Sequence, residues 1–134
     1  MAKLLKIGIV GCGAIRTSLA KTISSTFKDK AQIISLYDID LEKAYKLSNI
    51  LSIKKIVALN LDDLINSVDL VIEVASSKSS YEIAKKSLLA SKDIMIMSVG
   101  GIIDHYKELF ILAKERDRRL HIPSGAIAGL DGLK

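Results

Sequence analysis

The chain has 134 residues, 49% of them hydrophobic, which suits one domain with its own core and excludes a disordered chain. Its net charge of +5 arises from lysines and arginines interspersed with acidic residues, and only 4% of the residues are aromatic. Because side chains that could stack on bases are scarce, we interpret the charge as a solvated basic surface and expect no nucleic-acid partner.

Cysteine usage and hydropathy indicate the compartment. The single cysteine, Cys12, permits no internal disulfide and gives no zinc-ligand spacing. The sequence has neither an apolar run long enough to span a membrane nor a cleavage pattern near its start. We therefore expect a cytoplasmic protein without a membrane segment or a metal site.

Short apolar runs alternate with segments of helical periodicity, a pattern typical of a parallel sheet covered by helices on both faces. Strands are expected at residues 4–10, 31–37, 55–58, 70–74, 94–98 and 120–122. Helices are expected at residues 14–27, 41–51, 79–91 and 104–116, with a brief helical turn at 61–66. The elements predict one α/β, doubly wound domain over residues 1–134, with strand order 3-2-1-4-5-6 and a ligand at the carboxyl edge of the sheet.

Residues 7–16 read as a strand, a glycine turn and the start of a helix, the setting in which a G-x-G-x-x-G pattern binds a dinucleotide. Gly11 permits the tight turn, and Gly13 lets a pyrophosphate approach the backbone. We expect the intervening Cys12 and the following residues, Ala14 and Ile15, to complete this binding loop of a Rossmann domain.

Arg16 occupies the third position of the pattern, where glycine normally allows close packing of helix and strand. Two interpretations remain open. The side chain either weakens cofactor binding sterically or swings outward to contact a phosphate.

Asp38 follows the second expected strand, where Rossmann domains place a carboxylate that accepts a hydrogen bond from the adenosine ribose. A carboxylate there repels a 2′-phosphate, so NAD is expected to bind in preference to NADP, although NADP remains possible. Asp40 fits better as the N-cap of the next helix.

Two loops of small residues follow the fourth and fifth expected strands. Ala75 and Ser76 in the first, and Ser98 and Gly100 in the second, are expected to contact the nicotinamide half of the cofactor. The alternative for the first loop is a loose surface segment in which residues 79–80 only cap the next helix, and the second loop leaves the same choice open.

No group of residues suggests a catalytic site. His105 is expected in the first turn of a helix facing water, and His121 in a strand beside a basic run. Cys12 is expected to be a small packed side chain. We therefore name no catalytic residue.

The whole chain resembles the N-terminal part of the archaeal L-aspartate dehydrogenases, relatives of homoserine dehydrogenase. The resemblance is carried by residues 11–15, 37–44, 94–100 and 122–131, the last being the most specific. It implies the use of NAD or NADP to convert L-aspartate reversibly to iminoaspartate, which feeds NAD biosynthesis. It also implies that Gly11, Gly13, Asp38 and residues 75–76 hold the cofactor, and that Ser124 and Ala126 line its nicotinamide end.

In that family the catalytic histidine and most substrate contacts lie in a later domain. No residue before Lys134 matches that histidine, so we expect this chain to lack the catalytic domain and to be inactive on L-aspartate. Uncovered apolar surface predicts a homodimer. Alternatives are a homoserine dehydrogenase-like enzyme, a non-catalytic nucleotide-binding or redox-sensing module, and a non-binding assembly domain in which Arg16 has abolished the site.

Overall fold

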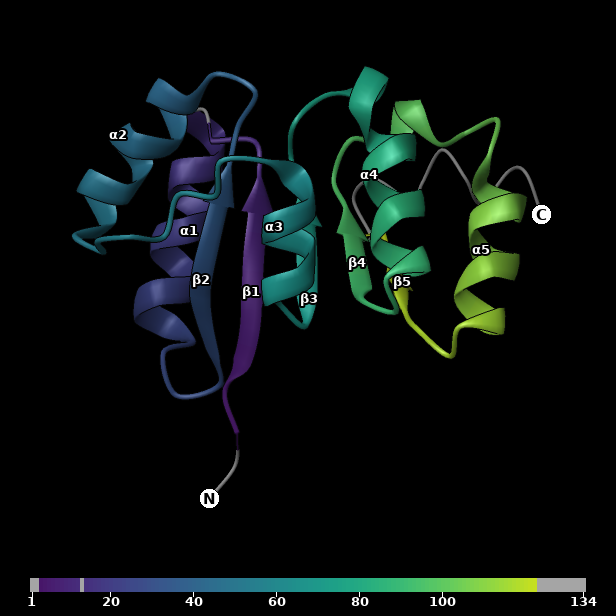
Figure 1. Cartoon of the computed structure of the whole chain (residues 1–134), viewed down its shortest axis with the longest axis horizontal. Helices are drawn as coiled ribbons and strands as arrows, with labels where there is room; N and C mark the ends of the chain where they lie inside the picture. Colours follow the sequence, from purple (N-terminus) through teal and green to yellow (C-terminus); the bar gives the residue numbers. More distant parts are fainter. Residues whose placement is uncertain (1–2, 13, 123–134) are drawn as a thin grey trace.

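A computed structural model describes residues 3–12 and 14–122, and of residues 14–16 only the backbone. Five parallel strands form one sheet in the order β2-β1-β3-β4-β5 (Figure 1). They are β1 (Leu5–Val10), β2 (Ala31–Tyr37), β3 (Leu70–Glu73), β4 (Asp93–Ile96) and β5 (Leu120–His121). The helices are α1 (Ala14–Thr26), α2 (Leu41–Leu51), α3 (Leu61–Ser67), α4 (Ser77–Leu89), the short 3₁₀ helix η1 (Val99–Gly101) and α5 (Tyr106–Glu115).

The expected third strand is reduced to one parallel bridge between Leu36 and Val57. The Leu36 N–H donates to the Ile56 carbonyl over 2.7 Å, and the Ala58 N–H donates to the Leu36 carbonyl over 2.8 Å. Lys55, with φ of 62°, turns the chain just before this segment and limits the pairing. With the bridge counted beside β2, the order is the predicted one, and the doubly wound fold is confirmed.

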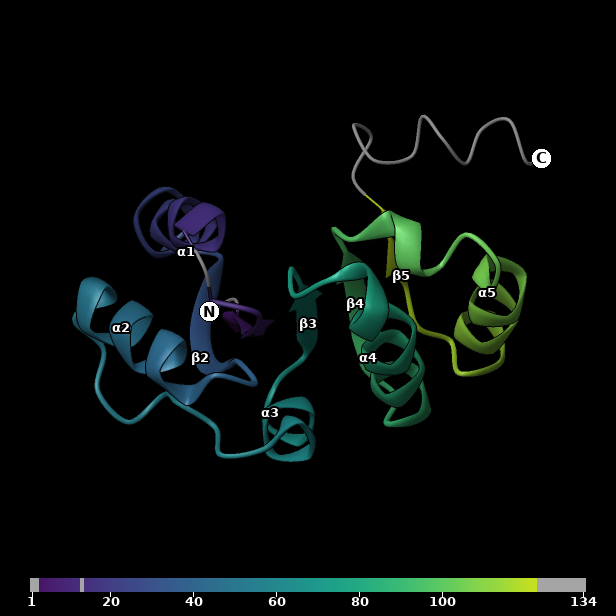
Figure 2. The ribbon, with the colours of Figure 1, turned by 90° about the horizontal axis from the view of Figure 1, so that it is seen from above.

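Each face of the sheet carries its own hydrophobic core. Ile7 and Ile9 of β1 belong to the core that includes residues of α1 and α2, whereas Val10 belongs to the core that includes residues of α3, α4 and α5. Side chains alternate between the two faces of a strand, so one apolar run supplies both cores. Seen along the sheet, α1 lies on one face, and α3 and α4 lie on the other (Figure 2).

The caps fix where the helices begin and end. Asp40 is the N-cap of α2 as expected, accepting from the Glu42 N–H over 3.1 Å. Helix α4 begins at Ser77 after the N-cap Ser76, earlier than the predicted start at residue 79. Asp117 has φ of 54°, the left-handed conformation that follows a helix end.

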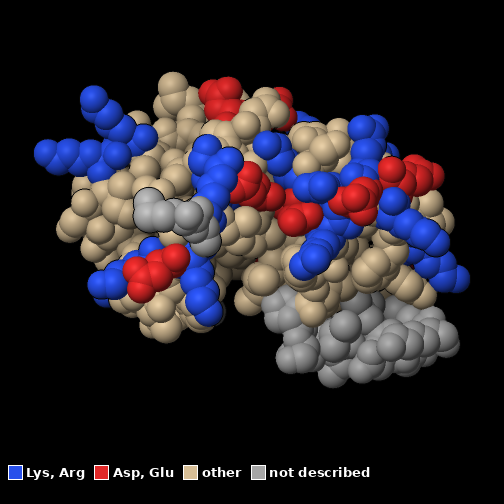
Figure 3. All heavy atoms as spheres, turned by 90° about the horizontal axis from the view of Figure 1, so that it is seen from below, with Lys and Arg blue, Asp and Glu red and all other residues tan. Residues whose placement is uncertain are grey.

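Charged side chains of both signs are mixed over the face of the molecule seen from below in Figure 3, where blue and red atoms lie side by side. Among the described helices, none has the length and apolar content needed to cross a membrane.

Candidate cofactor-binding site

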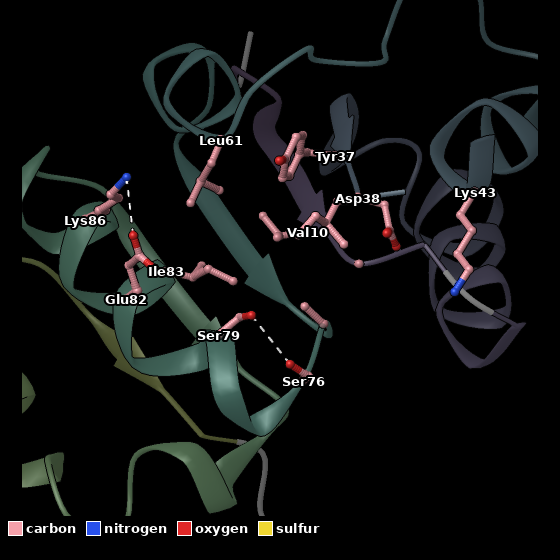
Figure 4. Close-up of a pocket in the computed structure, with 13 residues that line it drawn as sticks. Val10, Tyr37, Asp38, Lys43, Leu61, Ser76, Ser79, Glu82, Ile83 and Lys86 are labelled. Carbon is pink, nitrogen blue, oxygen red and sulfur yellow. Dashed lines mark hydrogen bonds and ion pairs between the residues drawn. The ribbon is translucent and has the colours of Figure 1, made fainter. Parts of the chain in front are cut away.

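A pocket of about 450 Å³ opens at the carboxyl ends of β1 and β2 and extends to α4 (Figure 4). Parallel α/β sheets bind ligands at this edge, where the strand order reverses. Val10, Leu61 and Ile83 give it apolar lining, and Gly11 and Asp38 also line it. The remaining lining residues are Tyr37, Ile39, Lys43, Ala75, Ser76, Ser79, Glu82 and Lys86.

Gly11 turns the chain out of β1 with φ of 100°, a conformation that L side chains rarely adopt. Its N–H donates to the Tyr37 carbonyl over 2.8 Å. A Cβ at this position would lie 2.7 Å from both the Cα and the N of Ala75. Only glycine therefore lets the turn pass this close to the loop after β3.

The Asp38 carboxylate is fixed by two backbone amides. Its Oδ2 accepts from the Cys12 N–H over 2.8 Å, and its Oδ1 accepts from the Asp40 N–H over 2.8 Å. A carboxylate has about four lone-pair sites, so each oxygen keeps acceptor capacity on a half-buried side chain. The two amides therefore hold the Asp38 carboxylate beside the glycine turn, where it can accept a hydrogen bond from a hydroxyl group.

An ionic contact lies at the rim of the pocket. Lys86 Nζ lies 3.6 Å from a carboxylate oxygen of Glu82, also on α4, and 3.7 Å from one of Asp62 on α3. Both carboxylates are largely exposed and the lysine is partly exposed, so these pairs are screened by solvent and add little stability. The contact between Lys86 and Asp62 links α4 to α3, and both helices contribute residues to the pocket.

Glu73 is a buried residue beside the pocket that the sequence analysis did not single out. Its side chain is fully buried at the end of β3, and its carboxylate accepts from the N–H groups of Ala75 and Ser98. The available signal was a single acidic residue in the apolar run at 70–74. Buried carboxylates need such partners, so an acid in a buried strand predicts a hydrogen-bonded role.

The structure brings several predicted site residues together. Gly11, Asp38, Ala75 and Ser76 line one pocket, and Cys12 joins them through its bond to Asp38. Cys12 is 5% exposed, as expected for a packed side chain, and its thiol donates to the Tyr37 carbonyl.

The other predicted residues lie beside the pocket or outside the described part of the chain. Ser98 and Gly100 belong to the neighbouring loop, where a Cβ on Gly100 would lie 3.2 Å from the Ser77 hydroxyl. Ala14 and Ile15 begin α1. Their side chains, that of Arg16, and the residues Gly13, Ser124 and Ala126 lie outside what is described.

The histidines lie away from the pocket. His105 is the exposed N-cap of α5 and stacks on Tyr81 with ring centroids 4.1 Å apart. Tyr81 donates to Glu108, and Lys85 donates to the Tyr81 oxygen over 3.3 Å. This hydrogen bond, with the charge of Glu108, raises the pKa of Lys85. His121 is half-buried in β5, in register with Met95 of β4.

Within residues 3–12 and 14–122, no three His, Cys, Asp or Glu side chains are grouped so that they could hold a metal ion. The sheet-edge pocket, the glycine turn and the oriented carboxylate instead define a dinucleotide-binding domain of the Rossmann class.

Comparison with known proteins gives the family. The sequence pattern of the homoserine dehydrogenase NAD-binding domain matches residues 11–123. The chain belongs to this family of NAD-binding domains. It is also 45% identical to the L-aspartate dehydrogenase of Methanocaldococcus jannaschii, over 98% of this chain and 49% of that protein. The resemblance identified from the sequence is thus confirmed, and the chain spans about half the length of the curated relatives that it matches.

Solved structures of dehydrogenases and reductases share the fold. GenD2 from gentamicin A biosynthesis, solved with NAD, has a TM-score of 0.79 at 19% identity, covering 91% of this chain and 35% of that one. Biliverdin reductase from a Synechocystis species, solved with biliverdin and NADP⁺, has a TM-score of 0.75 at 21% identity, covering 88% and 37%.

Proposed function

We propose that this chain is the NAD(P)-binding part of an oxidoreductase that converts L-aspartate to iminoaspartate. The observation that carries the cofactor assignment is the hydrogen bond from the Cys12 N–H to the Asp38 carboxylate. This bond joins the glycine turn to Asp38, the carboxylate that we propose binds the ribose, and Gly11 and Asp38 line the same pocket. The substrate assignment is supported by the identity of 45% to an L-aspartate dehydrogenase.

The residues present fit a dinucleotide. The volume of about 450 Å³ lies within the usual range of small-molecule sites, and the apolar walls suit a planar base. Gly11 and Asp38 would hold the phosphate and ribose portions, and Ala75 and Ser76 would contact the nicotinamide half. The nicotinamide supplies the hydride acceptor when bound, and the protein supplies orientation.

The Asp38 carboxylate favours NAD, because it accepts from a ribose 2′-hydroxyl and repels a 2′-phosphate. Lys43 lines the same pocket, and its positive charge offsets part of that repulsion. We therefore propose that NADP binds more weakly than NAD but is not excluded.

We also propose that the chain is one cytoplasmic domain, that it supports NAD biosynthesis, and that it forms a homodimer. Phe110 and Ile111 on α5 are 43% and 59% exposed, and an association of two copies would cover such side chains. Both described histidines lie away from the pocket, which supports the proposal that the chain is inactive by itself.

The test of substrate uses a chimera in which this chain replaces the matching half of the M. jannaschii relative, with the intact relative assayed in parallel. We expect reduction of NAD⁺ with L-aspartate by the chimera and no reduction by the 134-residue chain alone. Reduction of NAD⁺ by the chain alone would contradict the proposal that the chain binds the cofactor but is inactive by itself.

A second candidate substrate is L-homoserine, because the matching family is described by the homoserine dehydrogenase domain. The same chimera discriminates between the two. Reduction of NAD⁺ with L-homoserine but not with L-aspartate would overturn the assignment to aspartate.

A further inference from the structure

Glu73 occupies an unusual place for a charged side chain. It is 0% exposed and ends β3, between Val10 of β1 and Ile96 of β4 in the sheet register. This is the point where the strand order reverses, at the edge of the sheet that binds ligands. A carboxylate buried among apolar strands is costly unless hydrogen bonds compensate it.

The compensation comes from backbone amides in two different loops. Oε2 accepts from the Ala75 N–H over 2.9 Å, and Oε1 accepts from the Ser98 N–H over 3.0 Å. The backbone carbonyl of Glu73 also accepts from the Met97 N–H over 3.0 Å. One residue therefore ties the β3–α4 loop to the β4–η1 loop.

Both loops are in turn packed against other parts of the site. Ala75 is the residue that Gly11 approaches so closely that no Cβ fits between them. Ser98 is the N-cap of η1, and a Cβ on Gly101 in η1 would overlap the Ser77 carbonyl and the Ser80 hydroxyl of α4. The loop held through Ala75 is therefore packed against the glycine turn, and the loop held through Ser98 leads into a helix packed against the start of α4.

The adenosine side of the pocket is held differently. Asp38 accepts from the Cys12 and Asp40 amides, whereas Glu73 accepts from the Ala75 and Ser98 amides. The two halves of the site therefore have separate supports. One support is the Asp38 carboxylate and the other is the Glu73 carboxylate.

We propose that Glu73 is a positioning residue that sets the two loops for the nicotinamide half of the cofactor, while the adenosine half is bound independently of it. The inference rests on the proposed NAD(P)-binding function. It deepens that function by assigning separate supports to the two halves of one ligand.

The variant Glu73→Gln removes this support at nearly constant size. A glutamine amide has one acceptor oxygen and one NH₂ group, so it cannot accept from both the Ala75 and the Ser98 N–H groups. One of the two backbone N–H groups then loses its acceptor oxygen and faces the NH₂ group of the glutamine, which is itself a donor. Ser87→Ala is the matched control, because Ser87 is also 0% exposed and its hydroxyl donates to the Ile83 carbonyl within α4.

The experiment titrates each protein with NADH and, separately, with AMP, which carries only the adenosine half. We expect Glu73→Gln to weaken NADH binding about tenfold, the scale of one unsatisfied buried donor, and to change AMP binding less than about twofold. Ser87→Ala should leave both affinities unchanged. Equal weakening of NADH and AMP by Glu73→Gln, or no change in either, would overturn the inference.

A second measurement uses the wild-type chain, so it does not depend on folding of the variant. Amide hydrogen exchange at Ala75 and Ser98 should slow when NADH binds and stay unchanged when AMP binds. Exchange that responds equally to both ligands, or to neither, would contradict a specific role for these loops. A wild-type chain that binds AMP but not NADH would also overturn it, whereas a chain that binds neither ligand would refute the proposed function itself.

Discussion

Asp38 shows how one side chain links the local backbone to the choice of ligand. Its two oxygens are held by the amides of Cys12 and Asp40 before any ligand arrives. A side chain already fixed in its bound orientation loses little entropy on binding. In the proposed function, the carboxylate contributes both hydrogen-bonding energy and discrimination against a 2′-phosphate.

The variant Asp38→Asn should bind NADH about tenfold more weakly, because hydrogen bonds to a charged group contribute about 1.5–3 kcal/mol. The ratio of NADPH affinity to NADH affinity should rise, since the repulsion of the 2′-phosphate is removed. Fluorescence titration with both cofactors measures the two effects.

Asp40→Asn is the control for this change. Asp40 caps α2 through the Glu42 N–H, and asparagine is an equally good N-cap. Its cofactor affinities should match those of the wild type. An unchanged ratio of NADPH to NADH affinity in Asp38→Asn would show that Asp38 does not select between the cofactors.

At the scale of elements, the contact between η1 and α4 is the tightest feature beside the site. Gly101 lies against the first turn of α4, where Ser77 and Ser80 leave no space for a side chain. Gly100, its neighbour in η1, meets only the Ser77 hydroxyl, at 3.2 Å from where a Cβ would lie. The two glycines therefore form a matched pair with different packing.

The variant Gly101→Ala should lower the free energy of unfolding by about 1–3 kcal/mol, the usual range for forcing extra atoms into a packed region. Gly100→Ala should change it by less than about 0.5 kcal/mol, because the serine hydroxyl can rotate away. Urea unfolding measures both values. Similar destabilisation by the two variants would contradict the close packing of η1 on α4.

Most elements were predictable because buried parallel strands read as apolar runs between amphipathic helices. The segment at 55–58 has the same apolar signal, but the positive φ of Lys55 leaves only the bridge to Val57. The start of α4 was missed because four closely spaced serines, the pairs at residues 76–77 and 79–80, all resemble N-caps.

The site was predictable where a residue type has a local backbone role, as at Gly11 and Asp38. Glu73 could not be assigned in this way. Its partners Ala75 and Ser98 donate through backbone amides, and Ser98 is brought near only by the pairing of β3 with β4. No sequence pattern records a contact between a side chain and a distant backbone group.

At the scale of the whole molecule, the described sheet carries a separate core on each face, and the pocket lies at the edge between them. The chain spans about half the length of the curated relatives that it matches. We therefore propose cofactor binding, and not the substrate chemistry, for these residues.

Calorimetric titration of the 134-residue chain with NADH tests this central assignment most directly. The matched variant is Gly11→Ala, whose Cβ would collide with Ala75 and whose φ of 100° disfavours any side chain. We predict saturable binding of one NADH per wild-type chain and binding at least about tenfold weaker for the variant. No heat of binding to the wild-type chain at millimolar NADH, or equal binding by both proteins, would contradict it.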